Sequence, residues 1–135
     1  MSYATTNDLA LRLGATVYGE IYPEETEAAA DLADAEAEIN GCIGRRYLVP
    51  VTAPEALPLL KGWTLTLAEE RAYARAAGSS FTEKLNTRAA QVRKYLDEIR
   101  SGQFQLPGAA ENEQAVISIS QSDEEVFGRD NMEGF

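Results

Sequence analysis

The 135-residue sequence contains no histidine and only one cysteine, Cys42. Without histidine, the chain cannot form a Ser-His-Asp or Cys-His catalytic group, a His-ligated zinc site or the usual histidine pH switch. A single cysteine cannot form an intramolecular disulfide or a cysteine-based metal site. Cys42 lies near the end of a predicted helix, where the helix dipole disfavours a thiolate, so we interpret it as a small core or interface residue.

Long apolar runs, basic leader segments and phosphate-binding loops are missing too. No window approaches the roughly 18 uninterrupted apolar residues of a membrane span, so we expect no membrane partner. The start of the chain lacks a basic patch followed by an apolar stretch, so we expect no secretory signal and an intracellular protein. Neither standard Gly-rich phosphate-loop pattern occurs, and we expect no cofactor.

The net charge is −10, and it is arranged in blocks of alternating sign. Residues 1–60 carry ten acidic and three basic side chains, residues 61–102 five acidic and eight basic, and residues 103–135 seven acidic and one basic. Such a chain lacks the basic footprint needed to wrap nucleic-acid phosphates. The alternation favours self-association, in which an acidic part of one copy faces the basic segment of the next. Solvated helix faces are the alternative explanation.

Helix signals dominate the first three quarters of the chain. Thr5 and Asp8 resemble a capping box for a short helix that ends at Gly14, and residues 15–25 are predicted to form a loop. Apolar residues then recur at helical spacing in three longer segments, which run from about residue 24 to 43, from between 54 and 58 to about 77, and from about 80 to 102. The predicted buried stripes are Ala28, Leu32, Ala35, Ile39 and Ile43; Leu60, Trp63, Leu67 and Ala74; and Leu85, Ala89, Val92, Leu96 and Ile99. We therefore predict a mainly α fold, a small bundle of about four helices.

The pattern changes after Gly102. Residues 115–120 are rich in β-branched side chains and alternate in polarity, which predicts one short strand. A strand without a partner in its own chain invites pairing with another chain. We therefore predict two parts, a helical body over residues 1–102 and an extended C-terminal arm over residues 103–135. A terminal segment that folds back on its own body is the alternative.

Several residues are candidates for contacts between copies or with a partner. The candidates on the arm are Val116, Ile117, Ile119, Val126, Phe127 and Phe135. The candidates on the basic helix before the arm are Arg88, Arg93 and Lys94, which lie off its apolar stripe. The many alanines between residues 28 and 37 favour helix and allow a neighbour to approach closely.

Other chemistry has weaker support. Asp31, Asp34 and Glu38 lie at helical spacing and are able to hold Mg²⁺, but a solvated helix face explains them better because no further ligand cluster stands out. Trp63 is interpreted as a core residue rather than a base-stacking platform. A basic and aromatic run at residues 45–47 could touch nucleic acid, although a partner for the helix dipole explains it as well.

Taken together, the sequence resembles the short Mu-like phage and prophage neck proteins, the head–tail joining or connector proteins. The runs that carry the resemblance are Met1-Ser2-Tyr3-Ala4-Thr5, Ala33-Asp34-Ala35-Glu36-Ala37-Glu38-Ile39-Asn40-Gly41, Arg46-Tyr47-Leu48-Val49-Pro50, Lys94-Tyr95-Leu96-Asp97-Glu98-Ile99-Arg100-Ser101-Gly102 and Val126-Phe127-Gly128-Arg129-Asp130. They span essentially the whole chain in order. Cys42 departs from the pattern, since it stands where a tyrosine or another large residue is expected.

The resemblance implies a structural role without catalysis. It implies a helical subunit of a ring of twelve copies beneath the portal protein, in the virion neck, which extends the DNA channel and offers a landing surface for the tail. The implied partners are other copies, the portal protein and a tail-side neck or terminator protein, with DNA only as passing cargo and with assembly in the host cytoplasm. An acidic DNA mimic that inhibits a host DNA-binding protein is the alternative function, and a metal-dependent enzyme is a second.

Overall fold

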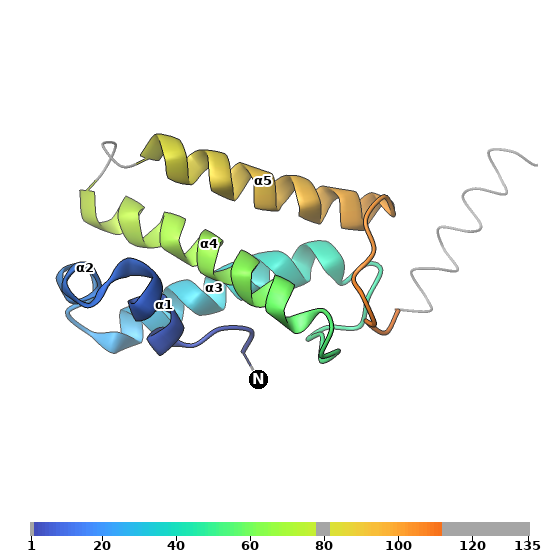
Figure 1. The fold of residues 1–135 in the computed structure, drawn as a ribbon, viewed down its shortest axis with the longest axis horizontal. Coiled ribbons are helices and arrows are strands. Elements are labelled where there is room, and N and C mark those ends of the chain that lie inside the picture. Colours follow the sequence, from blue (N-terminus) through green and yellow to red (C-terminus); the bar gives the residue numbers. More distant parts are fainter. Residues whose placement is uncertain (1, 78–81, 112–135) are drawn as a thin grey trace, which may run out of the picture.

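A computed structural model describes residues 2–77 and 82–111 of the chain (Figure 1). Its helices are α1 (Thr6–Leu13), α2 (Ala15–Ile21), α3 (Glu25–Ile43), α4 (Leu57–Ala77) and α5 (Thr82–Ser101). The predicted mainly α fold is confirmed, with five helices and no sheet among the described residues. Within the described residues, no helix is both long enough and apolar enough to cross a membrane.

The central element is α4, which packs against each of the other four helices. In Figure 1 it lies between α5 and the layer formed by α1 and α3. A helix with neighbours on several sides buries a wide arc, and α4 accordingly buries Leu60, Trp63 and Leu67 as predicted. Ala74 is exposed, contrary to the prediction, and Ala72 is buried instead. A stripe of residues at helical spacing marks the centre of a buried face. It does not predict which residues near the edge of a wide buried face, such as Ala72 and Ala74, are covered.

The residues predicted to be buried in α3 and in α5 lie on one face of each helix. All five predicted residues of α3 are buried, as are Ala89, Val92, Leu96 and Ile99 of α5. The capping box of α1 is also confirmed, since the Asp8 backbone N–H donates to the Thr5 hydroxyl at 3.1 Å and the Thr5 N–H donates to the Asp8 carboxylate at 2.9 Å. The start of the helix predicted from about residue 80 lies outside the described residues, which resume at Thr82.

The loop predicted at residues 15–25 is wrong for its first part, which forms the helix α2. Gly14 ends α1 at φ 91° and stands at the start of α2, so the chain turns sharply between two short helices. Ile21 and Tyr22 are buried at the end of α2. Their packing against the bundle outweighs the glycines, which weaken the helix signal in the sequence.

Candidate interaction surface

The chain turns back onto the helical body after α5. Gly102 adopts φ 90°, and a Cβ at this position would lie 2.9 Å from Nη1 of Arg46, so this turn requires glycine. The backbone N–H groups of Gln103 and Phe104 donate to the Glu98 carbonyl at 2.7 and 3.1 Å. These bonds direct the following residues back across the bundle.

Three aromatic rings join the returning segment, which we define as residues 103–111, to α4 and α5. Trp63 stacks on Tyr95 with ring centroids 5.8 Å apart, and Phe104 packs against both rings at 6.0 and 5.7 Å. Trp63 is only 6% exposed, which confirms its assignment to the core. The aromatic cluster therefore fixes residue 104 to the body.

Tyr47 holds the next part of the segment. Its hydroxyl accepts a hydrogen bond from the Leu106 N–H at 3.0 Å, and its backbone forms an isolated antiparallel bridge with Glu111. The Leu48 N–H donates to the Ala110 carbonyl at 2.8 Å. Residues 103–111, which we expected in the arm, thus pack against the body. The packing against the helical body therefore continues past residue 102, where we expected the arm to begin. The strand expected at residues 115–120 lies outside the described residues.

An apolar tip, which we define as Leu48, Val49 and Pro50, lies beside this segment and is exposed. Leu48 is 56% exposed and Val49 is 41% exposed. The tip is anchored on both sides, because Tyr47 before it and Val51 after it are each 3% exposed. Two neighbouring apolar side chains are therefore presented to solvent on a fixed base.

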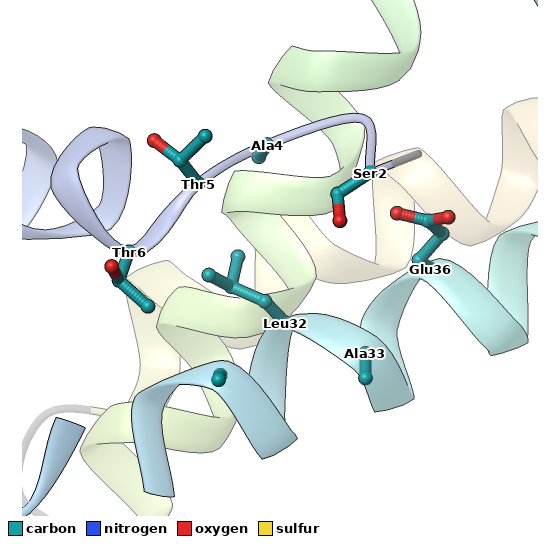
Figure 2. Close-up of a pocket in the computed structure, with 8 residues that line it drawn as sticks. Ser2, Ala4, Thr5, Thr6, Leu32, Ala33 and Glu36 are labelled. Carbon is teal, nitrogen blue, oxygen red and sulfur yellow. The ribbon is translucent and has the colours of Figure 1, made fainter. Parts of the chain in front are cut away.

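A groove lies between the N-terminal segment and α3 (Figure 2). Its volume is about 270 Å³. It is lined by Ser2, Ala4, Thr5, Thr6, Ala29, Leu32, Ala33 and Glu36. Ala4 and Leu32 are buried in its floor, while the small side chains of Ala29 and Ala33 leave the space open along the helix. Figure 2 shows Ser2 and Glu36 at the same end of the groove, where Glu36 also accepts the Tyr3 N–H at 2.9 Å.

Three arginines of α4 and α5 meet acidic residues of α3 within the same chain; these are Arg71, Arg75 and Arg93. Nε of Arg93 lies 2.7 Å from Glu38, and its Nη2 lies 2.8 Å from Glu70 of α4. These carboxylates raise the pKa of the Arg93 guanidinium, and the hydrogen bond from Arg93 is the main cause of the lowered pKa of Glu38. Arg93 is thus part of an intramolecular ion-pair cluster that joins three helices.

A second cluster surrounds Asp31. Arg75 donates to its two carboxylate oxygens at 3.1 and 2.9 Å, and the Tyr22 hydroxyl donates to it at 2.5 Å. Burial, and then the hydrogen bond with Asp31, raises the pKa of Tyr22. Although burial opposes the charged form, the bonds from Arg75 and Tyr22 leave the pKa of Asp31 lowered.

These ion pairs engage two of the three carboxylates whose spacing made them candidates for binding Mg²⁺. Asp31 and Glu38 are engaged by arginines, whereas Asp34 lies on the exposed side of α3. Among the described residues, no group of three or more histidine, cysteine, aspartate or glutamate side chains is arranged to hold a metal ion. The three carboxylates therefore do not form the shared site that their spacing allowed.

Of the remaining predicted interface residues, the structure describes only Arg88 and Lys94. Arg88 is exposed and its Nη1 lies 3.9 Å from Glu69, and Lys94 is exposed with no ion pair to any described residue. Val116, Ile117, Ile119, Val126, Phe127 and Phe135 lie outside the described residues. Sequence reasoning missed the tip and the groove, although the run Leu48-Val49-Pro50 and the alanines of α3 were their visible signals.

No match was found among curated proteins. Among protein families, residues 3–122 match the one described as Bacteriophage Mu, Gp36. This match covers all of the described helices, the tip, residues 103–111 and every residue that lines the groove except Ser2. The chain therefore belongs to the Bacteriophage Mu Gp36 family and is a phage protein.

Proposed function

We propose that this phage protein is a structural subunit of the virion neck, a head–tail connector that assembles into a ring beneath the portal protein. The observation that carries the proposal is the family match over residues 3–122, which agrees with the resemblance to Mu-like neck proteins along the chain. In this role the ring extends the DNA channel and provides the surface to which the tail attaches.

The distribution of charge supports passage of DNA without retention. The chain carries a net charge of −10, and like charge opposes binding of the phosphate backbone. Arg75 and Arg93 are neutralised by carboxylates of the same chain, so they add little to any positive surface potential. A channel made of such subunits lets DNA pass as cargo.

The apolar tip supports assembly. Removing apolar surface from water is worth about 25 cal/mol per Å², so exposed Leu48 and Val49 favour association when a partner covers them. Their fixed base means that little conformational entropy is lost on binding. The tip is thus suited to contact another protein surface.

Deletion of the gene in the phage that encodes the protein tests the proposed role. The expected products are DNA-filled heads and separate, complete tails, seen by negative-stain electron microscopy of lysates. A plasmid copy of the gene should restore joined particles. Normal numbers of tailed virions from the deleted phage would contradict the connector role, and a change in host DNA-binding protein activity instead would support the acidic DNA mimic.

A further inference from the structure

The tip and the groove occupy different places on the body. The tip follows the C-terminal end of α3, whereas the groove runs along Ala29 and Ala33 in its first half. At about 1.5 Å per residue, Ala33 and the end of α3 at Ile43 are about 15 Å apart along the helix axis. Because Tyr47 and Val51 anchor the tip at its own end of the bundle, it does not fill the groove of its own chain.

We propose that adjacent copies join by a knob-into-groove contact, in which the tip of one copy enters the groove of the next. This inference rests on the proposed ring and names the surfaces that build it. The occupant of the groove is therefore a second copy of this chain, and Leu48 is the side chain at the centre of the contact.

The chemistry of the two surfaces matches. The floor of the groove, formed by Ala4 and Leu32, is apolar, and Ala29 and Ala33 leave room above it. A groove with an apolar floor and small side chains along one wall suits apolar side chains of a neighbouring protein.

Charge complements shape at the edges of the contact. Arg45, which is exposed, precedes the tip, whereas Glu36 lines the groove and Asp34 is exposed beside it on α3. Opposite charges on the rims of two surfaces steer their encounter and fix their register. The sign of these charges therefore favours a copy-to-copy contact in the proposed direction.

The geometry also gives the right symmetry. When a copy places its tip in one neighbour and receives the tip of another neighbour in its groove, the contact is heterologous, because it joins two different patches. Such contacts repeat head to tail and close into a ring when the rotation between copies divides a full turn. A two-fold dimer, by contrast, would place the tip and the groove of each copy against one and the same partner.

Blocking variants test the contact by the yield of rings on the purified portal protein of the same phage. Ala33→Phe fills the groove, and Ala30→Phe is the matched control, because Ala30 is exposed on the same helix but does not line the groove. Leu48→Ser removes the knob, and Leu11→Ser is its control at an exposed leucine of α1. We expect at least about tenfold weaker assembly for each blocking variant, as loss of one buried leucine predicts, and near-normal assembly for each control.

A crosslink identifies the occupant directly. In a Cys42→Ser background, Leu48→Cys combined with Ala33→Cys should give a ladder of disulfide-linked copies in portal-bound rings. Wild-type rings with no ladder and with normal assembly of Ala33→Phe would overturn the contact and leave the connector role intact. A ladder from Val126→Cys with Ala33→Cys instead would assign the groove to the terminal segment. Absence of any ring of the wild-type protein would overturn the proposed function and this contact together.

Discussion

The Tyr3 hydroxyl accepts a hydrogen bond from the backbone N–H of Val51 at 2.9 Å. The same hydroxyl donates to Asn40 of α3 at 2.6 Å, and burial raises its pKa. Since Tyr3 lies in the N-terminal segment that walls the groove and Val51 directly follows the tip, one side chain ties the two proposed contact surfaces to α3. The relative position of tip and groove is thus built into the monomer.

Tyr3→Phe should lower the stability of the monomer. The change keeps the ring but leaves the Val51 N–H and the Asn40 amide oxygen without this partner, at a cost of about 1–3 kcal/mol. Tyr95→Phe is the control, because the Tyr95 hydroxyl has no hydrogen bond among the described residues. Urea denaturation followed by circular dichroism measures both. Equal losses for the two variants would contradict the role assigned to the Tyr3 hydroxyl.

Arg93→Gln should destabilise the bundle by about 1–2 kcal/mol, between the values for exposed and fully buried ion pairs. The guanidinium joins Glu38 of α3 to Glu70 of α4. Its loss leaves Glu70 without an ion pair to any described residue, and leaves Glu38 with only Arg71, at 3.5 Å. Arg100→Gln removes an exposed pair with Asp97 and should cost under about 1 kcal/mol. Thermal melts at pH 7 compare the two, and a larger effect at Arg100 would refute this ranking.

Acid should weaken the same cluster. Arg93 lowers the pKa of Glu38 below its ordinary value of 4.5. A group whose pKa is lower in the folded state contributes stability above its unfolded pKa, and that contribution is lost as the pH falls through the folded-state value. The wild-type protein should therefore lose stability below about pH 4.5 more steeply than Arg93→Gln. Parallel pH profiles of the two proteins, from urea titrations between neutral and acid pH, would argue against the coupling.

Two glycines should respond to alanine with opposite signs. Gly102→Ala places a Cβ against Arg46 at a position with φ 90°, and we expect a loss of about 1–2 kcal/mol. Gly62 lies inside α4 with nothing within 4 Å of a Cβ, so Gly62→Ala should add about 0.5–1 kcal/mol. Differential scanning calorimetry gives both signs. A stabilising Gly102→Ala would show that the turn after α5 does not need glycine.

Two truncations should separate the returning segment from the rest of the terminus. Deletion of residues 112–135 should leave a cooperatively folding helical monomer, because the five helices, the tip and the groove all lie within the residues that remain. Deletion of residues 103–135 also removes Phe104 and Leu106, so it should expose the aromatic cluster and shift the emission of Trp63, the chain's one tryptophan, to longer wavelength. Loss of the cooperative transition on deleting residues 112–135 would place that segment in the core.

The sequence predicts faces of helices better than it predicts which faces meet. The stripe from Ala28 to Ile43 was correct, because periodicity depends only on the helix itself. The partner of Arg93 was not predictable in the same way, since Glu38 and Arg93 are 55 residues apart and meet only after α3 and α5 pack. The helix α2 was missed because glycines at 14 and 19 hide a segment that tertiary packing stabilises.

The candidate surfaces depend on exposure, which a sequence pattern gives poorly. Only the folded chain shows that Tyr47 and Val51 are buried while Leu48 between them is exposed. The groove likewise needs the N-terminal segment to lie across α3. Alanines at 29 and 33 indicated room for a neighbour without indicating where that neighbour lies.

The mass of the assembly on the portal tests the central claim most directly. Light scattering would measure it over a concentration series of this protein with and without the purified portal protein, and negative-stain images of the same samples would show its shape. Our account predicts a closed ring of many copies on the portal. A protein that stays monomeric at every concentration and leaves the mass of the portal unchanged would contradict the connector role.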